Sequence, residues 1–188
     1  MSNAAQFATM TNKTIVWFRN DLRLSDNPAL LKAVRNGNVL PIYIYDDVNP
    51  KEAQIGSASR VWLHHSLESL NESLNGHLAF LKGDPIELIP KLAARYKISH
   101  VTWNRQYEPW AIARDTILKK SLTELGLNVE SHNGSLLWEP RNINKADGTP
   151  YRVFTPFYRK GCLNSTEPRK PTPEPINIQY IEHREHNA

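Results

Sequence analysis

One stretch of the sequence reads Trp17-Phe-Arg-Asn-Asp-Leu-Arg-Leu-Ser-Asp-Asn-Pro28 and joins an apolar, strand-like run to a helix-like run. Four charged side chains lie at this junction: Arg19, Asp21, Arg23 and Asp26. In an open α/β sheet, the junction of a strand with the next helix lies at the carboxyl edge, where ligands and partner surfaces bind. The stretch therefore predicts a functional edge, whereas the plainer alternative is a capped turn whose charges are merely solvated.

Strand-like and helix-like segments alternate through residues 13–135. The strand-like runs cover residues 14–19, 39–45, 78–81, 99–103 and 127–131. The helix-like runs cover residues 28–36, 58–74, 85–96 and 109–125, and three of them begin with a proline at the first helical position. Short apolar strands between amphipathic helices are typical of a parallel sheet that is covered on both faces. We predict an α/β fold, a Rossmann-like three-layer sandwich whose five-stranded parallel sheet has helices on both faces.

Proline also marks where this pattern is interrupted. Pro41 lies inside the second strand-like run and cannot donate a ladder hydrogen bond, so we expect it at the strand's first pair or at a sheet edge. After residue 135 the alternation ends, and prolines become frequent up to Pro175. We predict three parts: residues 1–12 are a disordered leader or cloning remnant, 13–135 are the α/β domain, and 136–188 are a connection that leaves the domain.

The bulk composition limits the classes of protein. At 188 residues and a net charge of +4, the chain has room for one good domain and too little for two large ones. No apolar run approaches the roughly 20 residues of a membrane helix, so we expect no membrane contact. The single cysteine, Cys162, excludes an internal disulfide and favours a reducing, cytoplasmic location. Residues 139–170 carry seven lysines and arginines against three acids, which fits contact with phosphates, a solvated loop or an acidic partner surface.

Several familiar site motifs are absent from the sequence. It contains no Gly-x-Gly-x-x-Gly or Gly-Lys-Ser/Thr phosphate loop, and no Gly-x-Ser-x-Gly elbow of a hydrolase. His64 and His65 are adjacent, and neighbouring residues on a helix point about 100° apart, which disfavours a shared ion. His183 and His186 form a second pair in the tail. We predict no functional metal site.

A second motif reads Trp103-Asn-Arg-Gln-Tyr-Glu-Pro-Trp-Ala-Ile-Ala-Arg-Asp115 and also follows a strand and opens a helix. It should therefore meet the first stretch along the same sheet edge. Its aromatic faces and polar edges suit a planar heteroaromatic ligand, and the residues that offer them are Trp103, Arg105, Gln106, Tyr107, Glu108 and Trp110. Alternatively, Trp103 belongs to the core, Trp110 packs on a neighbouring helix, and Arg114 and Asp115 brace their own helix. Arg60 could pair with an anionic ligand group, or it is an exposed helical arginine.

Four segments resemble, in order, the landmarks of the amino-terminal domain of the DNA photolyase/cryptochrome family: residues 17–28, Leu81-Lys-Gly-Asp-Pro85, residues 104–115 and Tyr151-Arg-Val-Phe-Thr-Pro-Phe-Tyr158. The resemblance covers about residues 14–159, and the third landmark is similar to that of bacterial cyclobutane pyrimidine dimer photolyases. It implies a Rossmann-like domain that holds an antenna chromophore, followed by a larger helical domain that holds FAD. In that family the antenna passes light energy to reduced FAD, which splits a pyrimidine dimer flipped out of DNA.

By this resemblance the chain is the light-harvesting part of a deoxyribodipyrimidine photolyase, a carbon–carbon lyase, and it stops before the FAD-binding domain. Its partners would be the helical domain of the same full-length chain and, through the full-length protein, damaged DNA. Alone it would hold no catalytic residue and be inactive. The antenna-binding residues would be Asp46, Arg60, Arg105, Gln106, Glu108 and Trp110. The residues that face the FAD-binding domain would be Arg19, Asp21, Phe154 and Phe157.

The family uses methenyltetrahydrofolate, 8-hydroxy-5-deazaflavin or, occasionally, another flavin as its antenna. One folate-binding branch has Asn and Glu where this chain has Trp110 and Ala111, and the deazaflavin branch favours an acid at the position of Gln106. Arg60 and Glu108 resemble the deazaflavin pattern. The Glu-Pro-Trp form resembles the branch that places folate against the position of Trp110, so we expect methenyltetrahydrofolate.

Two other functions stay open. A cryptochrome-type blue-light receptor shares this domain, and the residues that distinguish it from a photolyase belong to the helical domain. A stand-alone nucleotide-binding α/β protein of the adenine-α-hydrolase type would fit the strand order. It would need a glycine-rich or Ser-Gly-Gly phosphate loop, which the sequence lacks.

Overall fold

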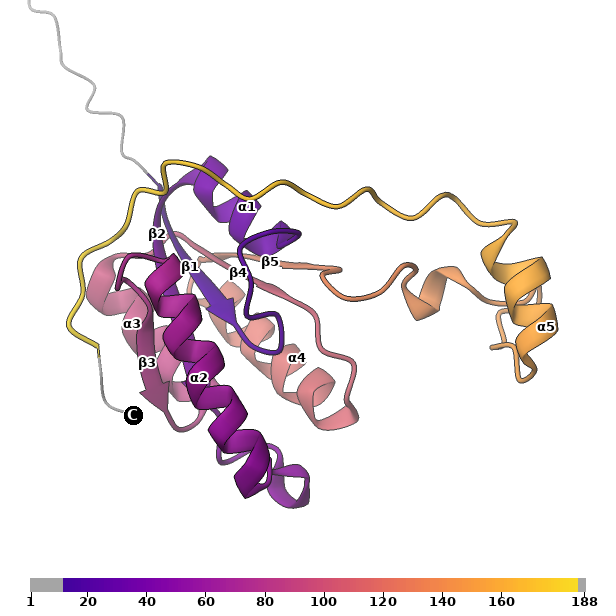
Figure 1. Cartoon of the computed structure of the whole chain (residues 1–188), viewed down its shortest axis with the longest axis horizontal. Coiled ribbons are helices and arrows are strands. Elements are labelled where there is room, and N and C mark those ends of the chain that lie inside the picture. The colour runs from indigo at the N-terminus through magenta and orange to yellow at the C-terminus, as the bar shows by residue number, and fades with distance from the viewer. Residues whose placement is uncertain (1–11, 186–188) are drawn as a thin grey trace, which may run out of the picture.

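The computed structural model describes residues 12–185, so the predicted leader lies outside the described residues except for Asn12, where the first strand begins. A single parallel sheet has the order β3-β2-β1-β4-β5 (Figure 1). Its strands are β1 (Asn12–Phe18), β2 (Gly37–Tyr45), β3 (Ala79–Lys82), β4 (His100–Asn104) and β5 (Asn128–His132). The helices between them are α1 (Pro28–Asn36), α2 (Ser57–Ser73), α3 (Pro85–Tyr96) and α4 (Pro109–Glu124). The predicted α/β fold is confirmed.

The sheet buries one hydrophobic core on each face. Along β1, Ile15 and Trp17 pack with residues of α3 and α4, whereas Val16 and Phe18 pack with residues of α1 and α2. Successive side chains of a strand point to opposite faces, so a continuous apolar run fills both cores of a doubly covered sheet. The strand predicted over residues 14–19 overlaps β1.

Helix starts follow the local sequence closely. Pro28, Pro85 and Pro109 each occupy the first turn, as predicted. Before the first two prolines, the Asn27 side chain accepts a hydrogen bond from the Leu30 amide at 3.1 Å, and Asp84 accepts one from the Ile86 amide at 2.9 Å. These caps satisfy amides that the helix itself leaves unpaired, which fixes where each helix begins.

Pro41 lies inside β2, an inner strand of the sheet, at a position that acts as a local edge. It pairs with Val16 of β1, but the pairing of β2 with β3 begins only at Ile42. On that side Val39 instead donates to the Gln179 carbonyl and accepts from the Ile181 amide, both at 2.8 Å. The missing N–H of Pro41 therefore falls between the tail and β3 and breaks no ladder hydrogen bond.

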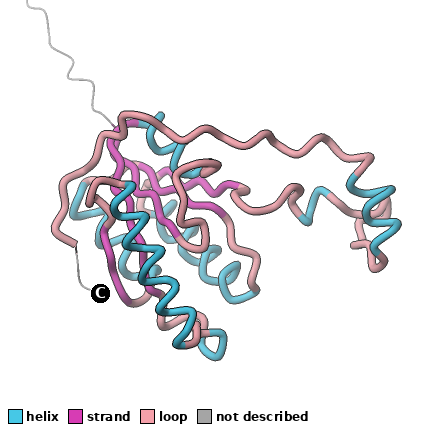
Figure 2. The backbone as a smooth tube through the Cα atoms, in the orientation of Figure 1, coloured by secondary structure: helices cyan, strands magenta, loops and turns pink. Residues whose placement is uncertain are grey.

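The connection after residue 135 does not leave the domain as the sequence predicted. It extends as an arm that carries the short helices α5 (Phe154–Pro156) and η3 (Phe157–Cys162), and it then returns to the domain (Figures 1 and 2). Ile181 is buried in the same core as α3 and α4. The tail fills the unpaired segment of β2, and burial of its apolar side chain stabilises the docked position.

Asp26 anchors the returning segment at a second point. Its carboxylate accepts hydrogen bonds from the Arg169 guanidinium at 2.5 Å and from the Thr172 amide at 3.1 Å, and its own amide donates to the Thr172 carbonyl at 2.9 Å.

Within residues 12–185, no helix combines the length and the apolar character needed to cross a membrane.

We expect Asp26→Asn to loosen this anchor. The hydrogen bond from Arg169 lowers the pKa of Asp26 below 3.8, so its carboxylate stabilises the folded chain above that pH and loses the effect as the pH falls. At pH 7, limited proteolysis should cut the variant faster near residues 166–174. Asn tolerates the positive φ of 47° at this position, so backbone strain is not introduced.

The control is Glu167→Gln, which removes an exposed acid from the same segment. The difference in unfolding free energy between Asp26→Asn and the original chain should shrink as the pH falls below 3.8. Equal proteolysis of both variants and the original chain at pH 7 would contradict the role of Asp26.

Candidate ligand site at the carboxyl edge of the sheet

A cavity of about 260 Å³ lies at the carboxyl edge, where β1 and β2 end and α4 begins. The side chains that define it come from three segments far apart in the sequence and include Trp17, Tyr43, Asp46, Gln106, Trp110 and Arg114. Parallel strands bring these segments together because their carboxyl ends meet at one edge.

Stacked aromatic and guanidinium groups form one wall of the cavity. The guanidinium carbon of Arg114 lies 4.6 Å from the centre of the Trp17 ring and 5.1 Å from that of the Trp110 ring. Arg19 lies 4.8 Å from the Trp17 ring. A cation held over an aromatic face is attracted by the ring quadrupole, so Arg114 joins the two tryptophans.

Carboxylates neutralise both arginines. Arg114 donates to Asp46 at 2.9 Å and to Asp115 at 2.8 Å, and Arg19 donates to Asp115 at 2.7 Å. The Trp103 indole N–H also donates to Asp115, at 3.1 Å. Burial lowers the pKa of Arg19, and the ion pair with Asp115 opposes that shift. Buried charges are stable only when they are paired and hydrogen-bonded, so this network holds β1, β4 and α4 in fixed positions.

The groups left free for a ligand are mostly donors. The Gln106 carbonyl oxygen accepts from Arg114 at 3.0 Å, which leaves the Gln106 amide N–H groups to donate. The indole N–H of Trp17 is buried and has no partner among the described residues. Burial raises the pKa of Tyr43 to about 12, so its phenol stays a neutral donor. The oxygens of Asp46 are already occupied by Arg114 and by the amides of Val48 and Asn49.

The structure brings together four of the six predicted antenna-binding residues: Asp46, Gln106, Glu108 and Trp110. Arg105 faces away, because its guanidinium donates to Glu139 at 2.6 Å and to the Ser131 carbonyl. Arg60 is exposed on α2, donates to the Ser57 hydroxyl at 3.1 Å and does not line the cavity. Trp103 is buried, as its core alternative predicted.

Two of the four residues expected to face another domain do not do so. Arg19 is only 5% exposed and Asp21 only 8%, so the expectation of an exposed contact surface there is wrong. The Asp21 carboxylate accepts from the Arg19 amide at 2.9 Å and from the Asn104 side chain, so it is used inside the domain. Phe154 and Phe157 are exposed on the arm, and their contact with another domain stays a prediction.

Sequence reasoning missed Trp17, Tyr43 and Arg114 as cavity residues. The two aromatic residues lie in apolar strand runs, and a strand-end residue next to a charged turn is the only local sign that one could face a ligand. Arg114 lies one helical turn after Trp110, a spacing that places both side chains on one face of α4.

In open parallel α/β sheets, small-molecule ligands usually bind in a crevice outside the carboxyl ends of the strands, which is where this aromatic cavity lies. Residues 14–176 match the family model described as DNA photolyase. The deoxyribodipyrimidine photo-lyase of Agrobacterium fabrum is 43% identical over 172 residues, which are 89% of this chain and 35% of that protein. The chain belongs to the DNA photolyase family.

Solved and curated relatives extend the comparison. The crystal structure of a bacterial class III photolyase from Agrobacterium tumefaciens superposes with a TM-score of 0.85 at 40% identity, covering 97% of this chain and 38% of that one. Cryptochrome-2 of Arabidopsis thaliana is 36% identical over 176 residues, which are 92% of this chain and 29% of that protein. The chain thus spans about a third of the length of these relatives.

We expect Arg114→Leu to destabilise the domain by about 3 to 5 kcal/mol, because it leaves Asp46 and part of Asp115 buried without a counter-charge. Urea unfolding followed by circular dichroism measures the change. Arg60→Leu, at an exposed position on α2, is the control and should stay within about 0.5 kcal/mol. Similar losses for the two variants would contradict the structural role of Arg114.

Proposed function

We propose that this chain is the amino-terminal light-harvesting domain of a deoxyribodipyrimidine photolyase. The observation that carries this proposal is the aromatic cavity at the carboxyl edge, which Trp110 and the Gln106 amide line together. The family membership and the 43% identity to the photo-lyase of Agrobacterium fabrum support it. The cavity holds an antenna chromophore, and the excitation energy passes to FAD in the helical domain of the full-length protein.

The residues of the cavity fit a planar heteroaromatic group. Trp110 is half-buried and presents a ring for stacking, while Gln106 and the unpartnered indole N–H of Trp17 provide donors. A chromophore with carbonyl or ring-nitrogen acceptors along one edge satisfies those donors, and Glu108 is the acid nearby that can accept from the ligand. We favour methenyltetrahydrofolate, with 8-hydroxy-5-deazaflavin as the alternative. When bound, the chromophore absorbs near-UV or blue light.

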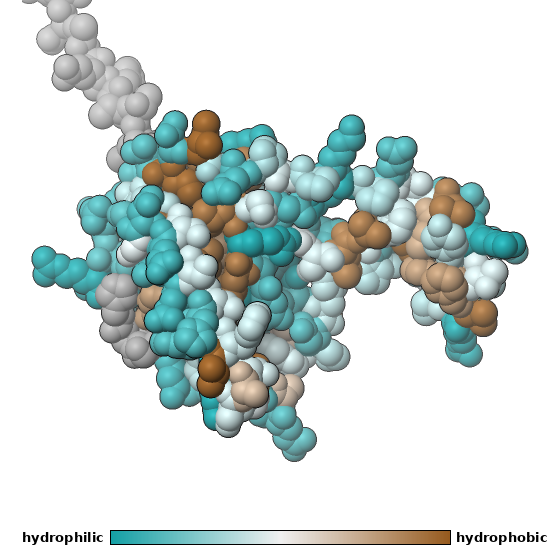
Figure 3. Space-filling view, viewed as in Figure 1, coloured by the Kyte–Doolittle hydropathy of each residue, from teal (hydrophilic) through white to brown (hydrophobic). Residues whose placement is uncertain are grey.

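The arm supports contact with the FAD-binding helical domain of the same full-length chain. Phe154 is 74% exposed and stacks on Tyr158 at 5.8 Å between ring centres, and Phe157 packs edge-on against Tyr151. Figure 3 shows apolar side chains gathered on this arm, away from the sheet. Exposed apolar patches of this kind mark interaction surfaces.

Damaged DNA is then a partner of the full-length protein, and the single buried cysteine supports a cytoplasmic location.

A cryptochrome-type blue-light receptor is the second candidate. The identity of 36% to cryptochrome-2 of Arabidopsis thaliana over 92% of the chain favours it specifically. The cavity would serve the same antenna role in either protein. Photolyase is preferred because the relative with 43% identity is a photo-lyase.

Titration with methenyltetrahydrofolate, followed by near-UV and visible absorption, tests the antenna site. We expect saturable binding that Trp110→Ala weakens by about tenfold or more, because a stacked aromatic pair contributes about 1 kcal/mol beyond the area it buries. Gln106→Glu should also weaken folate binding, because a carboxylate replaces the donor amide and repels acceptor atoms.

Trp62→Ala is the matched control, since Trp62 is 78% exposed on α2 and lies outside the cavity. Deazaflavin binding in place of folate binding would select the alternative chromophore. Folate binding that survives both cavity substitutions, or that Trp62→Ala abolishes, would refute this position for the site.

The chain alone should not split cyclobutane pyrimidine dimers under blue light. Among residues 12–185 we assign no group to flavin chemistry, and the chain spans 35% of the photo-lyase of Agrobacterium fabrum. Recovery of thymine absorbance at 260 nm in an irradiated dimer-containing oligonucleotide is the readout. Light-dependent repair by the purified chain, without added protein, would disprove the assignment as a light-harvesting part.

A further inference from the structure

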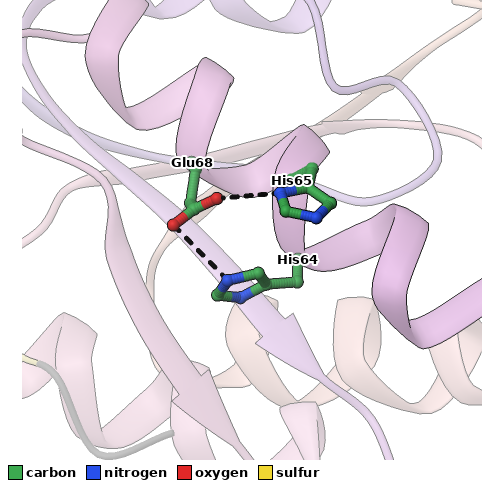
Figure 4. Close-up of side chains that lie close together, drawn as sticks. All are labelled: His64, His65 and Glu68. Atoms are coloured by element: carbon green, nitrogen blue, oxygen red, sulfur yellow. Dashed lines mark hydrogen bonds and ion pairs between the residues drawn. The ribbon is translucent and has the colours of Figure 1, made fainter.

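Two histidines and a glutamate gather on the exposed surface of α2 and do not line the cavity (Figure 4). The Nε2 atom of His64 lies 3.4 Å from one carboxylate oxygen of Glu68, and the Nδ1 atom of His65 lies 3.1 Å from the other. Each residue offers one ligand atom, and these three atoms all lie within 4.8 Å of one another. Although His64 and His65 are adjacent in the sequence, both imidazole rings approach the Glu68 carboxylate, which lies one helical turn further along α2.

The spacing is close to what a tetrahedral ion requires. Zn²⁺ binds histidine nitrogen and carboxylate oxygen at about 2.0 to 2.2 Å, so its ligand atoms lie roughly 3.3 Å apart. Each histidine nitrogen already lies at about that distance from an oxygen of Glu68, but His64 approaches one carboxylate oxygen and His65 the other. The three ligand atoms lie within 4.8 Å of one another, and the side chains of His64 and His65 are 68% and 69% exposed, so rotations about their bonds can bring both nitrogens and one Glu68 oxygen around a single ion.

The chemistry of the ligands selects the class of ion. Imidazole nitrogen suits Zn²⁺, Ni²⁺ and Cu²⁺, whereas Ca²⁺ and Mg²⁺ prefer oxygen ligands throughout. Among residues 12–185, the Glu68 carboxylate has no lysine or arginine partner that would compete with an ion. The amino-terminal half of α2 also stands clear of the core, since residues 57–62 are all exposed.

We propose that His64, His65 and Glu68 form a surface binding site for a divalent transition-metal ion of the Zn²⁺ class. The three side chains supply two nitrogen ligands and one oxygen ligand, and the fourth position is open to water. The ordinary alternative is a set of weak charge pairs at i,i+3 and i,i+4 spacing with no ion.

Isothermal titration calorimetry with ZnCl₂ distinguishes a metal site from a set of charge pairs that binds no ion. The original chain should bind Zn²⁺ saturably, and His65→Ala and Glu68→Gln should each weaken binding by about tenfold or more, since each removes one ligand. Glu72→Gln is the matched control, because Glu72 is exposed on the same helix one turn further on and pairs with no histidine among residues 12–185. Titration with Co²⁺ gives a second readout, because the visible absorption of the Co²⁺ ion changes when nitrogen and oxygen ligands of the protein replace its water ligands.

The pair His183 and His186 in the tail could bind metal independently, so the double variant His183→Ala/His186→Ala is titrated in parallel. Zn²⁺ binding that survives this double variant and is weakened by Glu68→Gln supports the site on α2. Binding that is lost in the double variant but unchanged in His65→Ala and Glu68→Gln overturns the proposal. Absence of saturable binding by the original chain at millimolar Zn²⁺ also overturns it.

Discussion

The carboxylate of Asp115 holds the carboxyl edge of this domain together. It accepts from Arg19 after β1, from the neighbouring Arg114 on α4, and from the Trp103 indole on β4. Side chains of Arg19 and Arg114 are only 4% and 2% exposed, so neither charge can be satisfied by water. A buried charge without its partner costs several kcal/mol, and the three elements are therefore stable only in this relative arrangement.

This network also determines the polarity of the cavity. Asp46 and Asp115 accept hydrogen bonds from Arg114, so their carboxylates are not available to a ligand. Arg114 also donates to the Gln106 carbonyl oxygen, which leaves the Gln106 amide N–H groups for a ligand. The cavity is thus rich in donors although the sequence around it carries many acids. The number of acids in residues 17–28 and 103–115 would suggest a cavity rich in acceptors. A ligand contacts only the groups that are left unpaired, and here these are mainly donors.

The sequence predicted the parts of the structure that depend on local signals. The helices Pro28–Asn36 and Pro85–Tyr96 carry their own start signals, and the strands carry continuous apolar runs. The errors concern contacts over long sequence separations. Arg19 meets Asp115 across 96 residues, and Asp26 meets the Thr172 amide across 146, so no local pattern shows that these groups pair. Which charges are buried, and where the tail docks, follow only from the assembled sheet.

The same long-range contacts distinguish the body of the domain, whose buried charges are paired internally, from an arm whose aromatic side chains are exposed. Arg19 and Arg23, the arginines of residues 17–28, pair with Asp115 and Asp26 within the domain, so no second domain is needed to neutralise them. The arm is fixed at its returning end by Asp26 and Val39, yet its aromatic residues Phe154 and Tyr158 stack on each other and remain exposed. Anchoring limits the entropy that docking would cost. A partner domain would therefore meet this chain at the arm, with the first motif serving as its internal support.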